Sequence, residues 1–189
     1  MEAKSTRQRW TYAEFARLPS EGSTRYEIID GELVVTPGPS LRHQRIVTDL
    51  SWLLNGFVRE NELGAVYSGP VDVLFAEGDY LEPDIVFVRR GREEEQTDRG
   101  IEGPPDLVVE VLSPSTAARD RGIKLERYRL YGVVEYWVVD GDQRSVEVWK
   151  LAEGAREPVV YAGAEPLHWD PAGSPTTLEF RLSELFGAE

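Results

Sequence analysis

Two acidic side chains stand inside apolar segments of this 189-residue chain, where a charge is costly to bury. Glu110 interrupts the run Leu107-Val-Val-Glu-Val-Leu112, and Asp84 follows a proline at the start of Ile-Val-Phe-Val. A buried carboxylate needs a compensating cation, and metal ions and lysines are the usual ones. The pattern therefore predicts a site in which both carboxylates meet a cation. Their hard oxygens suit Mg²⁺ or Mn²⁺.

Lys124 is the candidate cation within the protein itself. It lies on a predicted helix behind the Glu110 strand, and Asp120, Lys124 and Tyr128 recur on it at four-residue steps. Residues at that spacing share one helix face, so Asp120 can hold Lys124 toward the strand ends. Only three of the 21 basic side chains are lysines, which makes this one more informative than any single arginine.

The elements that must position these residues are two buried strands, 83–88 and 107–112, followed by a helix over about 117–131 and a strand over 133–139. If the two buried strands are neighbours, Asp84 and Glu110 converge at one edge of the sheet. A strand, a helix and a further strand, with hairpins before and after, predict an α/β (α+β) fold around a mixed central β-sheet flanked by helices. We expect one domain over residues 1–189, because no repeat or linker divides the chain.

Other elements follow from local patterns. A capping box predicts a helix from residue 11 to 18, and an apolar stripe predicts an amphipathic helix over 41–60 that carries His43 in its first turn. Residues 26–35 predict a hairpin that turns at Asp30-Gly31 and carries Glu27. The charged stretch 89–104 predicts a mobile surface loop. Further strands are expected over 64–67, 71–75, 145–150, 158–161 and 176–180, with a helical turn over 183–186.

Composition restricts the function classes. The net charge of −13 argues against nucleic-acid binding by bulk electrostatics, although a local basic groove or a metal ion can offset it. The chain has no cysteine, which excludes disulfides and thiolate metal sites, and two histidines supply too few ligands for a zinc hydrolase. No apolar run is long enough for a membrane span or a signal peptide, so we expect a cytoplasmic protein.

The joint order of these motifs resembles the Uma-type restriction endonuclease family, long catalogued as a domain of unknown function, within the PD-(D/E)XK nuclease superfamily. The resemblance covers roughly residues 10–150. It rests on Pro83-Asp84, on Glu110-Val-Leu-Ser-Pro-Ser-Thr116, on Asp120, Lys124 and Tyr128, and on Glu135-Tyr-Trp-Val-Val-Asp140. It extends to Tyr26-Glu-Ile-Ile-Asp-Gly-Glu-Leu33, His43 and residues 64–73.

The resemblance implies a restriction endonuclease-like core and a metal-dependent endonuclease that hydrolyses phosphodiester bonds of double-stranded DNA. Asp84, Glu110, the carbonyl of Val111 and Glu27 would hold Mg²⁺ or Mn²⁺, which would activate a water. Lys124 would orient that water, and His43 would contact phosphate or assist proton transfer. Cutting both strands implies a homodimer.

The sequence departs from the superfamily pattern at Leu112, where the lysine two residues after the glutamate is expected. The resemblance to the Uma-type family implies that this lysine stands on the following helix instead, which points to Lys124. The move preserves the geometry only if the helix packs across the strand ends.

Two other readings stay open. The fold could be catalytically silent and serve as a nucleic-acid- or protein-binding module, which the net charge favours. Alternatively, Glu110 could have a structural role paired with an arginine such as Arg121. Asp72 could reach the same site from the preceding strand, whereas Tyr128, Tyr131 and Trp137 are expected in the core. The arginines of 89–104 are the best candidates for DNA contacts: Arg89, Arg90, Arg92 and Arg99.

Overall fold

A six-stranded mixed sheet forms the centre of the molecule in this computed structural model, which describes residues 9–19, 24–76, 78–171 and 174–187. The strand order of this central sheet is β12-β11-β10-β9-β6-β3. Only β9 and β10 are parallel neighbours, and the other pairs are antiparallel. The predicted mixed central sheet is therefore confirmed. Its strands are β3 Gly64–Ser68, β6 Ile85–Arg89, β9 Leu107–Val111, β10 Glu135–Asp140, β11 Ser145–Lys150 and β12 Val159–Ala162.

A second six-stranded sheet has the order β2-β1-β5-β4-β8-β7 and was not predicted as separate from the first. The predicted hairpin over 26–35 forms two of its strands, and both turn residues adopt positive φ, 53° at Asp30 and 80° at Gly31. The strands are β1 Arg25–Ile29, β2 Glu32–Thr36, β4 Val73–Ala76, β5 Asp79–Leu81, β7 Gln96–Thr97 and β8 Gly100–Glu102.

The stretch 89–104, expected as a mobile surface loop, contains regular secondary structure. This stretch contains a 3-10 turn at Glu93–Glu95 (η1) and the strands β7 and β8. Its arginines serve internal contacts, since Arg92 donates to Glu95, Asp106 and the carbonyl of Pro104. Arg99 likewise pairs with Glu102, whereas Arg89 and Arg90 pair with Asp106 and Glu62 outside the stretch.

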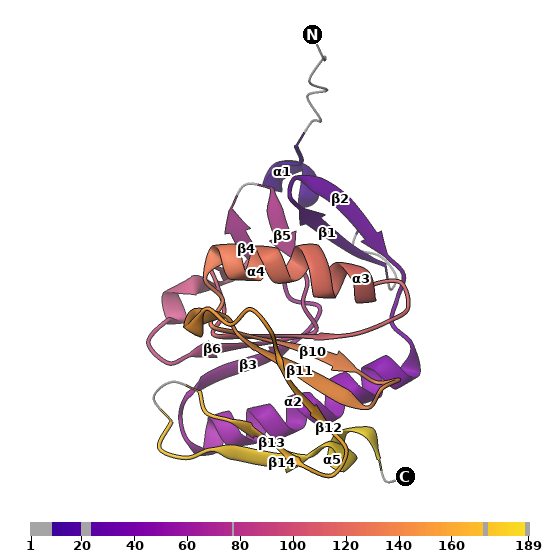
Figure 1. Ribbon diagram of the computed structural model, residues 1–189. Coiled ribbons are helices and arrows are strands. Elements are labelled where there is room, and N and C mark those ends of the chain that lie inside the picture. Colours follow the sequence, from indigo (N-terminus) through magenta and orange to yellow (C-terminus); the bar gives the residue numbers. More distant parts are fainter. Residues whose placement is uncertain (1–8, 20–23, 77, 172–173, 188–189) are drawn as a thin grey trace.

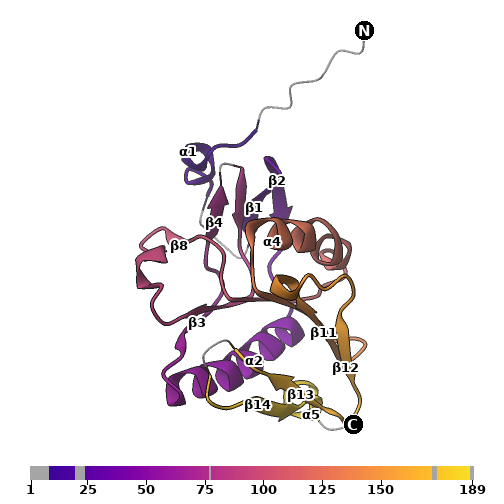
Figure 2. The same cartoon turned by 60° about the vertical axis from the view of Figure 1, so that its left-hand side comes forward.

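One face of the central sheet is covered by α2, Leu41–Glu60, the predicted amphipathic helix (Figures 1 and 2). Ser40 caps it by accepting the His43 N–H at 3.2 Å. Its buried residues join a core that also contains the C-terminal hairpin of β13 Pro166–Trp169 and β14 Leu178–Arg181, together with α5 Leu182–Phe186. No helix within the described ranges is long and apolar enough to cross a membrane.

The other face is covered by the helical segment between β9 and β10, which lies between the central sheet and the second sheet (Figure 1). It was predicted as one helix over 117–131 but contains three parts: α3 Ala117–Arg119, a π-helical turn Asp120–Lys124 (η2) and α4 Leu125–Tyr131. Gly132 ends it in the left-handed region with φ 84°. π-Helical turns are rare and occur often at functional sites.

The remaining differences are shifts of element ends and two missed strands, β5 and β13. The first helix is α1 Tyr12–Phe15, shorter than 11–18, and the strand expected over 133–139 begins only at Glu135. The partner of the last strand, β13, was not predicted.

Candidate active site

Asp84 directly precedes β6, and Glu110 lies in the neighbouring strand β9. β6 pairs antiparallel with β9, with Ile85 opposite Val109, so the start of one strand lies beside the end of the other. Both side chains are buried, with 1% of Asp84 and 4% of Glu110 exposed. The convergence expected from the sequence therefore occurs at this edge of the central sheet.

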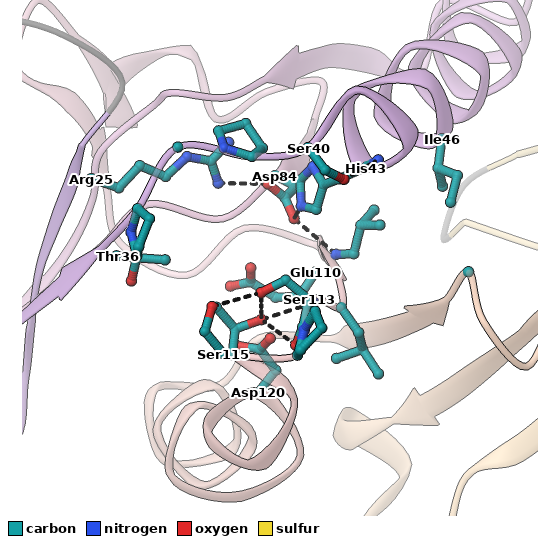
Figure 3. Close-up of a pocket in the computed structure, with 18 of the residues that line it drawn as sticks. Arg25, Thr36, Ser40, His43, Ile46, Asp84, Glu110, Ser113, Ser115 and Asp120 are labelled. Carbon is teal, nitrogen blue, oxygen red and sulfur yellow. Dashed lines mark hydrogen bonds and ion pairs between the residues drawn. The ribbon is translucent and has the colours of Figure 1, made fainter.

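Asp84 accepts three hydrogen bonds from three different elements. Its Oδ2 accepts the backbone N–H of Val111 at 2.8 Å and lies 3.1 Å from Nε2 of His43 on α2. Its Oδ1 accepts Nη1 of Arg25, the first residue of β1, at 2.6 Å. Burial alone would raise the pKa of Asp84, but the hydrogen bond and charge of His43 together with the charge of Arg25 hold that pKa below its usual value. In Figure 3, Asp84 lies between Arg25 and His43.

Lys124 is the last residue of the π-helical turn, and it contacts Glu110 from the face of the central sheet that this helical segment covers. Its Nζ lies 2.8 Å from Glu110 Oε1, 2.7 Å from Glu27 Oε1 and 3.8 Å from Asp120 Oδ1. Burial alone would lower the pKa of Lys124, but the three carboxylates raise it above its usual value. The same Glu110 oxygen accepts the hydroxyl of Tyr128 at 2.7 Å.

This cluster holds more negative than positive charge. Four buried carboxylates, those of Glu27, Asp84, Glu110 and Asp120, face Lys124 and Arg25, with Arg119 at 3.6 Å from Glu27. Burial raises the pKa of Glu110 and of Asp120 despite the nearby ammonium group. Burial, followed by the charges of Asp72 and Glu27, raises the pKa of half-buried Glu82 to about 7.

The four carboxylates border one cleft of about 430 Å³, together with Arg25, His43, Glu82 and Lys124 (Figure 3). Acidic residues and Lys124 line one part of it. The rest is lined by the segment 36–43, which leads into α2, and by the turn 113–116, whose hydroxyls bond each other. Arg42 and Asp142, both also lining the cleft, form an ion pair at 2.6 Å. The cleft therefore combines carboxylates, one ammonium group and neutral donors, a set suited to a metal ion and a phosphate ester.

Comparison with known proteins identifies the family. A model of the Uma2 family, described as "Putative restriction endonuclease", matches residues 12–183, most of the chain. This protein belongs to the Uma2 family. The match is wider than the 10–150 expected from the motifs alone and includes the C-terminal hairpin.

Two relatives illustrate how the Uma2 chain compares with other proteins. "Uncharacterized protein sll1609" of Synechocystis is 26% identical over 132 residues, which cover 69% of this chain and 74% of that protein. A crystal structure described as a "putative nuclease belonging to DUF820" from Anabaena variabilis aligns over 94% of this chain and 97% of its own, with a TM-score of 0.78 and 22% identity. At that identity the structural match supports the fold.

The Uma2 cleft fits a hard divalent cation by its donor chemistry. Carboxylate oxygens are the ligands that Mg²⁺ and Mn²⁺ prefer, and the excess of buried negative charge matches a dication. Among the described residues, however, no three acidic, histidine or cysteine side chains already stand in a metal-holding arrangement. Instead, Arg25 bonds Asp84 Oδ1 and Lys124 bonds Glu110 Oε1. The residues that would hold the ion, Asp84, Glu110, Val111 and Glu27, therefore stay a prediction.

The predicted site residues all line this one cleft: Glu27, His43, Asp84, Glu110, Val111 and Lys124. Asp72 does not; it lines a second cavity beside it. Arg121 is not the partner of Glu110, because its guanidinium pairs with Asp140 and Glu147. Tyr128 is buried as predicted, yet its hydroxyl also bonds Glu110, a contact that the core interpretation did not include.

Three further residues of the Uma2 site were missed by sequence reasoning: Arg25, Glu82 and Arg119. Arg25 lies two residues before Glu27, and Glu82 two residues before Asp84. Alternation along an extended segment places residues i and i+2 on one side, so this spacing was a usable signal. Arg119 has no comparable signal, since its contact with Glu27 joins two distant segments.

Proposed function

We propose that this Uma2 protein is a metal-dependent endonuclease that hydrolyses phosphodiester bonds of double-stranded DNA, with Mg²⁺ or Mn²⁺ as cofactor. The observation that carries the proposal is the convergence of Asp84, Glu110 and Lys124 on one cleft, with Lys124 Nζ 2.8 Å from Glu110. Membership of a family described as restriction endonucleases supports a nuclease-like hydrolase. Metal dependence and the DNA substrate are our inference.

Asp84 and Glu110, with Glu27 and the Val111 carbonyl, would hold the ion. When bound, it would lower the pKa of a water and offset charge on the phosphate. Asp84 is suited to this role because its lowered pKa keeps it charged at neutral pH. The bond between His43 and Asp84 Oδ2 fixes the orientation of that carboxylate, so we assign His43 as a positioning residue.

Lys124 acts as a permanent positive charge rather than as a proton acceptor, because three carboxylates hold it protonated. An ammonium group has three N–H donors. Two of them serve Glu27 and Glu110 at under 3 Å, and the third can orient a water or stabilise charge on the phosphate. Glu27, on the second sheet, holds the Lys124 ammonium group in place. Glu27 is therefore a positioning residue for Lys124 as well as a proposed metal ligand.

The cleft volume of about 430 Å³ suits one nucleotide rather than a duplex. DNA would therefore contact the rim as well, and a homodimer would present two such clefts to the two strands. The second candidate, a catalytically silent binding module, is favoured by one observation: Arg25 and Lys124 already neutralise the oxygens that a metal would need.

A plasmid-nicking assay with Mg²⁺ or Mn²⁺ tests the proposal. Asp84→Asn and Lys124→Ala should each reduce the nicking rate on the order of 100-fold or more, because each removes a group that acts on the transition state. Lys150→Ala is the matched lysine control, since Lys150 lies outside the cleft and pairs with Glu153. Thermal unfolding verifies that each variant is folded. Equal nicking by all four proteins, or none by the wild type, would contradict the assignment.

A further inference from the structure

Among the described residues, the Oδ1 atom of Asp84 is bonded by a single side chain, that of Arg25. Oδ2 is bonded by the backbone of β9 and by His43 on α2. Oδ1 is bonded by Arg25 and by no other described residue. A divalent cation that binds Asp84 through Oδ1 therefore competes with the Arg25 guanidinium for that oxygen.

Arg25 also has room to leave, whereas Lys124 does not. Lys124 is 4% exposed and contacts three carboxylates, so its departure would leave them without a counter-charge. The Arg25 side chain is 17% exposed and lines both the cleft and the neighbouring cavity of about 460 Å³. Figure 3 shows it reaching Asp84 from the side opposite His43.

We propose that Arg25 exchanges partners during the reaction: a divalent cation displaces it from Asp84 Oδ1, and the released guanidinium then binds the substrate phosphate. This inference rests on the proposed function. The electrostatic reason is that a dication and a guanidinium repel each other at one oxygen, while a phosphate diester entering the cleft supplies a new anionic partner. A planar guanidinium offers paired N–H donors that match phosphate oxygens, which a lysine cannot do.

The test compares Mn²⁺ binding by the full-length wild type, Arg25→Gln and Arg25→Lys, measured by calorimetry without DNA. Arg25→Gln should bind Mn²⁺ about tenfold more tightly, since the competing ion pair is lost. Arg25→Lys keeps the charge but loses the guanidinium geometry, so its affinity should lie between the two. Arg25→Lys also provides the test of Mn²⁺ affinity if Arg25→Gln fails to fold.

Arg92→Gln is the matched control. The Arg92 side chain is likewise 17% exposed and pairs with a largely buried aspartate, Asp106, but it does not line the cleft. Its Mn²⁺ affinity should equal that of the wild type. A second measurement is the KM for a short DNA duplex at saturating Mn²⁺, which should rise about tenfold in Arg25→Gln with a smaller change in kcat.

Each outcome bears on a separate claim. Unchanged or weaker Mn²⁺ binding in both Arg25 variants would overturn the exchange, and nicking by the wild type would then leave the proposed function standing. Tighter Mn²⁺ binding without any nicking would support displacement of Arg25 and count against the nuclease. An unchanged KM in an active Arg25→Gln would overturn the phosphate contact. Absence of Mn²⁺ binding in all proteins would overturn the exchange together with metal dependence.

Discussion

Asp84, directly before β6, and Glu110, on the adjacent strand β9, have surroundings that shift their pKa values in opposite directions. The donors around Asp84 are cationic or backbone groups, and they outweigh the effect of its burial. Glu110 is also buried and has three other carboxylates near it, so its pKa is raised although Lys124 is bonded to it. Two carboxylates whose pKa values are shifted apart in this way differ in how readily they lose a proton, and Asp84 ionises before Glu110 as the pH rises.

Glu82 should make the stability of the metal-free protein depend on pH. Its pKa in the folded state is about 7, above the usual value of 4.5 for glutamate. Between these two values the folded protein holds a proton that the unfolded chain has lost, so raising the pH favours unfolding. Replacing Glu82 by Gln removes this penalty. We expect Glu82→Gln to be more stable than the wild type by about 1–2 kcal/mol at pH 8, allowing for solvent screening at this half-buried site, and equal to it near pH 4.

Urea unfolding in the presence of a chelator at pH 4, 6 and 8 measures this effect. Glu126→Gln, which makes the same charge change at an exposed position of α4, is the control and should show no comparable gain at pH 8. A Glu82→Gln stability that parallels the wild type across this range would contradict the burial of the Glu82 charge.

At the scale of elements, the edge strand β3 supports β6 and therefore Asp84. Gly64 opens β3 with φ 148° and lies against the backbone of β6: a Cβ there would stand 2.1 Å from the Val88 carbonyl oxygen. Because that neighbour is backbone, it cannot move aside cheaply. We expect Gly64→Ala to lower the free energy of unfolding by about 2–4 kcal/mol.

Gly56→Ala gives the comparison for the Gly64 substitution, with unfolding in guanidinium chloride as the measurement. A Cβ at Gly56 on α2 meets no atom within 4 Å, so alanine should stabilise the protein by about 0.5–1 kcal/mol. Equal stability of the two variants would show that the contact between β3 and β6 is looser than described.

The parts of the fold and the site that could be predicted are those whose sequence patterns lie within short segments. Glu110 within a valine-rich strand and the four-residue spacing of Asp120 and Lys124 are both visible in short windows, and the structure places these residues together. The second sheet could not be predicted as a separate sheet. Its strands β4 and β8 pair although β6 of the central sheet lies between them in the sequence, and no single segment indicates this pairing. The spacing from Glu27 could have placed Arg25 on the same side of its strand, but its contact with Asp84 joins the second sheet to the central one and has no local signal.

The helix behind Glu110 shows a partial success of the same kind. Helical spacing correctly placed Lys124 and Tyr128 toward the sheet, and both bond Glu110. The π-helical turn was not predicted, because an apolar pattern of period 3.6 does not distinguish a locally widened turn from a regular one.

At the scale of the whole molecule, the net charge of −13 opposes a polyanionic substrate. DNA binding should therefore depend on a divalent cation. We expect Lys124→Ala, in which cleavage is suppressed under the proposed mechanism, to bind a fluorescent duplex at least tenfold more tightly with Mg²⁺ than with a chelator at equal ionic strength. Fluorescence anisotropy measures the affinity.

Asp84→Asn combined with Lys124→Ala is the control for this binding experiment. It removes the proposed Mg²⁺ ligand with only a small change in total charge, so its affinity should no longer respond to Mg²⁺. A response of the same size in both proteins would indicate screening of the surface as a whole, and would count against a specific ion in the cleft.

Because Lys124 is buried, its reaction with an amine-reactive reagent can report when the surrounding elements separate. The chain has three lysines, and the side chain of Lys124 is 4% exposed whereas that of Lys150 is 47% exposed. An amine-reactive reagent can acylate Lys124 only when the ammonium group leaves its carboxylates, loses its proton and meets solvent. The ratio of acylation at Lys124 to acylation at Lys150, followed by mass spectrometry over time, therefore records how often the second sheet and the helix separate from the central sheet, without any added label or substitution.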